Sequence, residues 1–342
     1  MKIIGNIIIG LVIVLALGLI GKQYLKEIPT NTMSVEEGSS TLNVVAQKTV
    51  EEYNVIILTS ANEDGKITPK TIELAFKEAG FFINDNRDMI KPFIKNFKTV
   101  TYDVYNLFTT FRKLNVLKLV TKYPTIGLFS PMSMSIYTKK GSNTISISSL
   151  SLEAMAKIMG IPVDDEDLVE YVGLIQEALH KALPNGKREK VTYKMQKTTG
   201  DLTYTTQLKI KEDADAEDVK DEFEEDFEEA LTMNNFIMAG FNDLNYDFDE
   251  AGYEEYTFYD VYSICNLSVI YTVSAKHPEA GAFAPCSLYM YNKKGSNTIE
   301  MGFPSVYNWI ASVAIEDKAS LDVLMSAQVT MEKLLTKLVN EK

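Results

Sequence analysis

The heptapeptide KKGSNTI occupies residues 139–145 and returns unchanged at residues 293–299, an offset of 154. Chance does not plausibly supply an identical heptapeptide twice in a chain of 342 residues. Self-similarity at one fixed spacing indicates a repeated structural unit. We therefore expect this chain to contain one fold twice.

The same landmarks surround both copies of the heptapeptide. The tetrapeptide YDVY stands at residues 102–105 and again at residues 259–262. A proline, a glycine and a second proline follow in each copy, namely Pro124, Gly127 and Pro131, then Pro278, Gly281 and Pro285. The offset is 157 at YDVY and 154 at the prolines. We therefore expect three residues to be missing from the second copy between these points.

Each copy has the periodicities of a mixed fold of helices and strands. Thr68 and Pro69 are typical of a helix start, and Gly80 is typical of a helix end. Apolar and polar residues alternate over residues 202–210, which predicts a half-buried strand. The heptapeptide lies in the turn of a predicted hairpin in each copy. The resulting order, β-α-β-β-α-β-β-α, predicts two tandem α+β domains, each with an antiparallel sheet and helices on one face.

Composition divides the chain into four parts. Residues 1–27 contain an apolar run, and residues 28–41 are rich in Ser, Thr, Gly and acidic residues, as in a flexible stalk. Residues 42–186 hold the first α+β repeat, and residues 187–342 hold the second. The sequence Pro-Asn-Gly directly before residue 187 marks the boundary between the repeats.

The apolar run begins at Ile3 and ends at Ile20, with Asn6 as its one polar side chain. A helix of this length extends roughly 27 Å, which nearly spans a bilayer core. A signal peptide has a shorter apolar region and a small-residue cleavage site, so we expect an uncleaved transmembrane anchor, with a cleaved signal peptide as the alternative. We expect a single-pass bacterial inner-membrane protein whose soluble part lies in the periplasm or otherwise outside the cytoplasm.

The overall composition excludes several function classes. The net charge of −13 repels a phosphate backbone, so we expect no nucleic-acid partner. The chain has no phosphate-binding glycine loop, no nucleophile elbow and no zinc-protease helix motif. These absences point away from an enzyme and predict no cofactor.

Two stretches of the second copy carry a family resemblance. They are YSICN at residues 262–266 and HPEAGAFAPCSLYMY at residues 277–291. Both are similar to the core motif of the domain-of-unknown-function 302 family, and the likeness covers about residues 202–316. In the first copy Met132 stands where that family has cysteine. The resemblance implies a fold similar to the TATA-box-binding-protein-like class, with a curved antiparallel sheet that grips a helix, and it implies no established activity.

The only two cysteines, Cys265 and Cys286, both fall at motif positions of this resemblance. One ends a predicted strand and the other opens the next strand, a placement that favours their proximity. Three interpretations remain open, which are inert buried thiols, a disulfide or redox pair, and contact with a ligand or metal. His277 is a third soft ligand nine residues before Cys286, but we do not expect a metal site.

A pocket edge is predicted around these cysteines. Asn266 offers hydrogen-bond donors and acceptors there, although it is equally suited to cap the helix that follows it. Tyr289 lies on one sheet face with Tyr291, where the pair either lines an apolar ligand cleft or packs across strands. The predicted binding residues are Cys265, Asn266, His277, Pro285, Cys286 and Tyr289.

The sequence therefore predicts a membrane-anchored, extracytoplasmic binding protein for an unidentified small molecule or protein. One alternative is a thiol-redox or metal-contacting protein that uses Cys265 and Cys286. Another is a scaffold that pairs with a partner through the helix predicted over residues 318–339. The apolar stripe of that helix consists of Leu321, Leu324, Gln328, Met331, Leu335 and Leu338.

Overall fold

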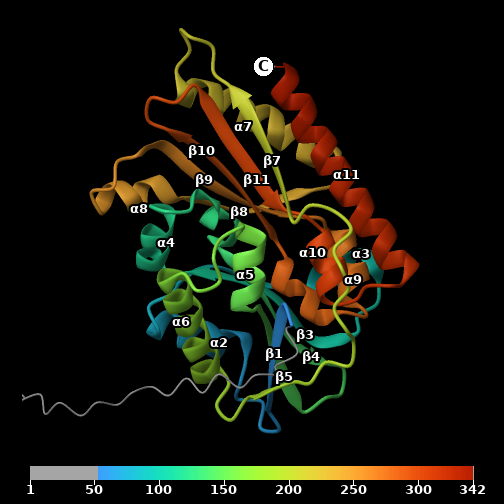
Figure 1. Ribbon diagram of the computed structural model, residues 1–342. Helices are drawn as coiled ribbons and strands as arrows, with labels where there is room; N and C mark the ends of the chain where they lie inside the picture. The colour runs from blue at the N-terminus through green and yellow to red at the C-terminus, as the bar shows by residue number, and fades with distance from the viewer. Residues whose placement is uncertain (1–52, 342) are drawn as a thin grey trace, which may run out of the picture. The chain divides into compact units, whose positions relative to one another are not determined.

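The computed structural model describes residues 53–341 (Figure 1), which belong to one compact unit made of two halves. The elements of the first half are β1 (Val55–Ala61), α2 (Pro69–Glu78), β2 (Phe82–Asp88), α3 (Ile90–Phe97), β3 (Tyr102–Phe111), α4 (Lys113–Val120), the 3₁₀ helix η1 (Pro124–Phe129), β4 (Met132–Lys139), β5 (Thr144–Leu150), α5 (Leu152–Met159) and α6 (Glu166–Ala182).

The second half repeats this order of elements. After β6 (Lys187–Arg188) come β7 (Thr203–Lys209), α7 (Ala216–Met233), β8 (Ile237–Asp243), α8 (Leu244–Glu250), β9 (Tyr256–Cys265), α9 (Leu267–Ser274), the 3₁₀ helix η2 (Pro278–Phe283), β10 (Cys286–Lys293), β11 (Thr298–Pro304), α10 (Tyr307–Ser312) and α11 (Lys318–Glu341).

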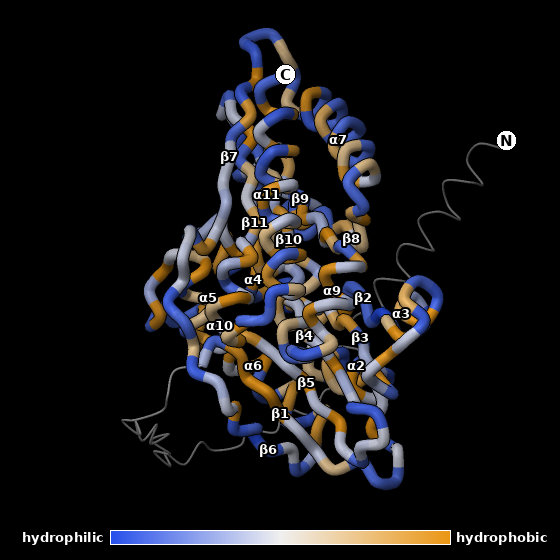
Figure 2. Tube along the Cα trace, turned by 90° about the vertical axis from the view of Figure 1, so that its right-hand side faces the viewer, coloured by the Kyte–Doolittle hydropathy of each residue, from blue (hydrophilic) through white to orange (hydrophobic). Residues whose placement is uncertain are grey.

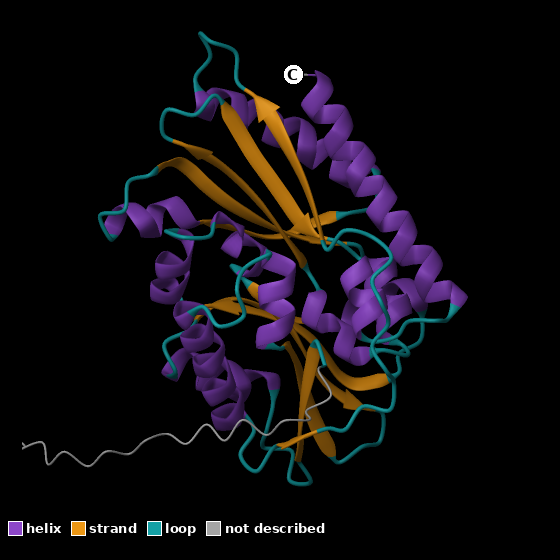
Figure 3. Cartoon of the chain, in the orientation of Figure 1, coloured by secondary structure: helices purple, strands orange, loops and turns teal. Residues whose placement is uncertain are grey.

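Each half builds one antiparallel sheet, and the strand orders correspond. The first sheet runs β2-β3-β4-β5-β1-β6 and the second runs β8-β9-β10-β11-β7. Figure 3 shows both sheets with helices packed around them. The predicted α+β class with two antiparallel sheets is confirmed. The order of elements predicted from the sequence lacks the short helices α3, α5, α8 and α10 and both 3₁₀ helices. Such short segments carry too little periodicity to be predicted.

The halves match at a constant offset of 154 from β3 and β9 through the start of β5 and β11. Tyr105 therefore corresponds to Tyr259, not to Tyr262 as the two YDVY tetrapeptides suggest. The predicted loss of three residues from the second copy is wrong for this reason. The two tetrapeptides are identical in letters but lie three residues out of step in the strands.

Local sequence signals place the long helices well. The Thr68 hydroxyl accepts a hydrogen bond from the backbone N–H of Thr71, and Gly80 adopts a φ of 82° just after α2. Asp165 caps α6 in the same manner. The stripe predicted on the last helix is buried against its own half, because α11 packs on α7, α9 and β7. The stripe therefore contacts its own half, and pairing with a partner through α11 stays a prediction.

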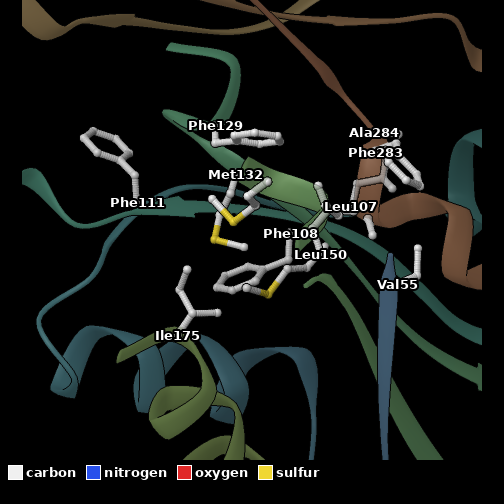
Figure 4. Close-up of a cluster of buried hydrophobic side chains, with 14 of the residues drawn as sticks. Val55, Leu107, Phe108, Phe111, Phe129, Met132, Leu150, Ile175, Phe283 and Ala284 are labelled. Atoms are coloured by element: carbon white, nitrogen blue, oxygen red, sulfur yellow. The ribbon is translucent and has the colours of Figure 1, made fainter. Parts of the chain in front are cut away.

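Both faces of the central strands are buried. In β4, Met134 and Ile136 lie in the hydrophobic core, while Ser133 and Ser135 alternate with them and are also buried. Small serine side chains leave room on this face for a segment of the other half. Figure 4 shows Phe283 and Ala284 of the second half in the core cluster of the first.

The two 3₁₀ helices form reciprocal contacts between the halves. The Tyr105 hydroxyl donates a hydrogen bond to the Pro278 carbonyl at 3.2 Å, and the Tyr259 hydroxyl donates to the Pro124 carbonyl. Ser133 donates to the carbonyl of Pro285, and Ser287 donates to that of Pro131, both at 2.8 Å. Each contact is made twice with the roles exchanged, as in an interface with twofold symmetry.

The described residues contain no helix with the length and apolar character that a membrane crossing requires. The predicted anchor between Ile3 and Ile20, and the stalk after it, lie outside the described residues and stay predictions.

The close approach of the halves predicts opposite effects for two glycines. A Cβ atom on Gly127 would lie 2.4 Å from the Tyr259 hydroxyl and 2.6 Å from the Cβ of Tyr289. We expect Gly127→Ala to lower the free energy of unfolding by about 1–3 kcal/mol through overpacking. Gly173→Ala in α6, where nothing lies within 4 Å, should raise it by about 0.5–1 kcal/mol. Urea unfolding of both variants measures this, and equal stability of the two would contradict the interface.

Candidate functional site

An apolar cavity lies in the second half, where the ends of β9, β10 and β11 meet α9, α10 and α11. The cavity has a volume of about 60 Å³, measured as the space open to the centre of a water molecule. Its apolar walls include Phe236, Ile264, Leu288, Phe303, Leu324 and Met331. One water needs about 10–15 Å³ by this measure, so the cavity holds about four to six atoms of that size.

Both cysteines line this cavity as free thiols. Cys265 is buried at the end of β9, and Cys286 is partly buried at the start of β10. Burial raises the pKa of each thiol to about 12, and the nearby Arg87 opposes this only partly at Cys265. A nucleophilic cysteine needs a lowered pKa. The thiol-redox alternative therefore stays a prediction, and these pKa values do not favour it.

Asn266 lies at the mouth of the cavity and caps α9. Its Oδ1 accepts hydrogen bonds from the backbone N–H groups of Ser268, at 3.0 Å, and Val269, at 3.3 Å. The capping role considered from the sequence is confirmed. Its position in the wall of the cavity leaves the side-chain amide group beside any ligand there.

A larger, open groove adjoins the cavity. A water-sized sphere can move its centre through about 980 Å³ of this groove, which shares Phe236, Asn266, Val269 and Ala327 with the cavity wall. Figure 2 shows α3, β8, α9 and α11, which supply much of its lining, on one side of the molecule. Its polar side chains are almost all neutral amides and hydroxyls, namely Asn96, Thr232, Asn234, Asn235, Asn266, Ser268, Ser326 and Thr330, with Asp322 as the one charged residue.

Two further residues of the cavity wall, Trp309 and Gln328, were not among the predicted binding residues, although Gln328 belongs to the stripe predicted on the last helix. Trp309 on α10 is 3% exposed, and its indole Nε1 has no hydrogen-bond acceptor in the described chain. Gln328 on α11 is buried, and its Oε1 accepts a hydrogen bond from the backbone N–H of Val306 at 2.9 Å. Trp309 is the only tryptophan of the chain, which is the one sequence signal that marked it.

The structure separates the remaining predicted residues from this cavity. His277 lies at another hollow, where its ring nitrogens are 3.9 Å from Glu279 and 3.8 Å from Asp317. It is not part of the cysteine site. Within residues 53–341, no group of three or more His, Cys, Asp or Glu side chains is arranged to hold a metal ion.

Pro285 and Tyr289 lie at the contact between the halves. The carbonyl of Pro285 accepts the hydrogen bond from Ser133, and the Tyr289 ring stacks on Tyr291 with centroids 5.7 Å apart. Tyr291 in turn stacks on Tyr259 at 5.2 Å. These tyrosines form the cross-strand packing that the sequence allowed as one interpretation, on the face that meets the first half.

A charged cluster lies on the same sheet but lines none of the hollows described here. Asp260 on β9 is 2% exposed, and its Oδ2 lies 3.2 Å from the Nζ of Lys220 on α7. Burial raises the pKa of Asp260 to about 7, although Lys220 opposes the shift and Asp243 adds to it. This ion pair links α7 to the second sheet, and we assign it a structural role.

Comparison with known proteins supports the family resemblance in the second half. Residues 215–338 match the family model described as "Domain of unknown function DUF302". A solved structure, the crystal structure of uncharacterized conserved protein DUF302 from Bacillus stearothermophilus, has 19% sequence identity and a TM-score of 0.32. The match covers 41% of this chain and 98% of that chain. No curated protein matches the chain. The family match does not extend into the first half.

The raised thiol pKa values predict slow modification of the folded protein. A rise from 9.0 to about 12 lowers the thiolate fraction about a thousandfold, and the greater nucleophilicity of a basic thiolate recovers part of this. We expect both thiols to react with Ellman's reagent at pH 8 about 30- to 60-fold more slowly than in urea. Cys265→Ser and Cys286→Ser report each thiol alone. A native thiol that reacts at the unfolded rate would contradict the assigned burial.

The Asp260 carboxyl predicts a specific pH dependence of stability. Its pKa is higher in the folded state, about 7, than its ordinary value of 3.8. The folded protein therefore keeps a proton that the unfolded chain loses, and stability falls as the pH rises from 4 to 7. Relative to wild type, Asp260→Asn should gain stability over this range, by at most on the order of 4 kcal/mol. Urea unfolding at several pH values tests this, and parallel pH curves would contradict it.

Proposed function

We propose that the second half binds a small amphipathic molecule, with its apolar end in the cavity beneath α11 and its polar end in the adjoining groove. The observation that carries this proposal is that an apolar cavity and a mostly neutral polar groove share four wall residues. Three of the residues predicted from the sequence, Cys265, Asn266 and Cys286, line the cavity. Apolar pockets with a few placed polar groups are the usual form of small-molecule sites.

The size of the cavity limits the apolar part of the ligand. Space for about four to six water-sized atoms suits a short alkyl chain or one ring. The free thiols, with their raised pKa values, act here as small apolar wall groups.

The lining of the groove favours an uncharged polar head. Amide and hydroxyl side chains both donate and accept hydrogen bonds, as hydroxyl-rich ligands require. Asp322 is the only charged residue of the groove, and it already pairs with Lys318 at 2.6 Å. A charged head group on the ligand would therefore have no ion-pair partner in the groove.

We further infer that the first half is a diverged copy of the family domain and that both halves have the TATA-box-binding-protein-like fold. The shared order of elements and the constant offset support this inference. The predicted anchor between Ile3 and Ile20 would place the groove of this protein near a membrane outside the cytoplasm, where short-chain amphipathic molecules concentrate.

The single tryptophan gives a site-specific test of binding. Four probes with the same six-carbon chain, hexyl β-glucoside, 1-hexanol, hexanoate and hexylammonium, are titrated into the full-length protein while Trp309 fluorescence is recorded. We expect the two neutral probes to shift the emission with saturation and the two charged probes to bind at least about tenfold more weakly. Equal binding of all four would contradict the polar-head assignment, and no response to any would contradict the site.

Two variants of α11 provide the matched control. Ala327 lines both the cavity and the groove, so Ala327→Phe should abolish the fluorescence response by filling the site. Val329 is 40% exposed two residues away on the same helix and lines neither hollow. Val329→Phe should therefore bind the neutral probes as wild type does.

A further inference from the structure

A separate hollow lies where both halves meet the segment that joins them. It is lined by Tyr137 and Lys139 at the end of β4, by residues 189–193 of the joining segment, and by residues 276–279 of the second half. Figure 1 shows the joining segment, in yellow-green, between α6 and β7. A water-sized sphere can move its centre through about 370 Å³ of this hollow. It shares no lining residue with the cavity or groove described above.

A buried carboxylate lines the hollow. Glu279 is 7% exposed, and His277 is its only ion-pair partner within 4 Å in residues 53–341. The two atoms concerned, Nδ1 and Oε1, are 3.9 Å apart, which is too far for a hydrogen bond. A buried carboxylate without a close cation is unfavourable, so this wall is suited to receive a positive group.

The surrounding tyrosines suit the same positive group. Burial, followed by the Glu279 carboxylate, raises the pKa of Tyr137 and Tyr193, so both hydroxyls stay protonated near the acid. The Tyr193 hydroxyl is buried beside the Glu279 carboxylate. Aromatic rings also attract an ammonium group through their negative faces.

The mouth of the hollow carries two lysines without an ion-pair partner, beside the exposed Glu189. Lys139 and Lys190 line it, both are exposed, and neither has a carboxylate within 4 Å in the part of the chain that the structure describes. Lys276, the third lysine of the lining, is already paired with Asp317 at 3.0 Å. Two unpaired cations therefore lie outside a buried anion.

We infer that this hollow binds a small zwitterion of the amino-acid type, with its ammonium group at Glu279 and its carboxylate toward Lys139 and Lys190. The ammonium group would form a charge-assisted hydrogen bond with Glu279 and meet the rings of Tyr137 and Tyr193. The hollow is large enough to hold one molecule of this size. This inference does not depend on the amphipathic-ligand site, because the two sites share no residue.

The first experiment identifies the ligand class with named probes. Each of the twenty L-amino acids, at about 10 mM, is added to the full-length protein and the melting temperature is measured. The amino acid with the largest shift is then titrated by calorimetry beside its N-acetyl derivative, which lacks the ammonium group. We expect the free amino acid to bind at least about 30-fold more tightly than the N-acetyl form. No shift with any amino acid, or equal binding of the two forms, overturns the inference.

The second experiment assigns each charge to its partner. Glu279→Gln should weaken binding at least about 30-fold, and the double variant Lys139→Ala/Lys190→Ala should weaken it about 3- to 10-fold. The methyl ester, which lacks the carboxylate, should bind this double variant and wild type equally. Lys187→Ala, at an exposed lysine of β6 outside the hollow, should change nothing.

Unchanged binding in a folded Glu279→Gln variant overturns the inference. If that variant does not fold, the methyl ester decides, since an ester that loses affinity in the double variant also overturns it. Trp309 fluorescence reports the amphipathic-ligand site separately, so failure at one site is distinguishable from failure at the other.

Discussion

The structure depends on the exchange of two 3₁₀ helices between its halves. η1 and η2 each lie against the face of the opposite sheet that bears serines and tyrosines. A buried tyrosine hydroxyl of that sheet donates a hydrogen bond to the carbonyl of the first residue of each 3₁₀ helix. The peptide N–H of Gly127 also donates to the Tyr259 hydroxyl, at 3.1 Å. Because both faces of the central strands are buried in this way, neither sheet has a solvated face at its centre. The residues left over for ligands therefore lie at the ends of strands and beside the joining segment.

The two proposed sites follow from this arrangement. The helices α7 and α11 pack on the outer face of the second sheet, and the apolar cavity remains at the corner where β9 ends and β10 begins. The hollow at Glu279 forms instead because the joining segment passes over the start of η2. The apolar cavity of the first site belongs to the second half alone, whereas its groove and the hollow at Glu279 include residues of both halves. They differ in chemistry accordingly, with apolar walls in the first and separated charges in the second.

Sequence patterns predicted the elements whose signals are local. The hairpins around KKGSNTI, the cap at Thr68 and the long helices are found where periodicity and capping residues place them. The 3₁₀ helices were missed because their partners, such as Tyr259 for Gly127, lie more than 130 residues away. Only part of the candidate site was predicted, for the same reason. Cys265, Asn266 and Cys286 come from one motif, but Trp309 and Gln328 reach the cavity only through the packing of α10 and α11.

The reciprocal contacts also explain how a half without the cysteine motif persists in this chain. Met132 occupies the position of Cys286, so the first half has no thiol at the corner where the second half has one. It still provides the surface that covers the tyrosine face around Tyr289 and Tyr291. Each half therefore depends on the other through the shape of this shared surface, and the first half meets that dependence without the thiols of the second. Away from the shared surface, the first half is free to differ from its counterpart.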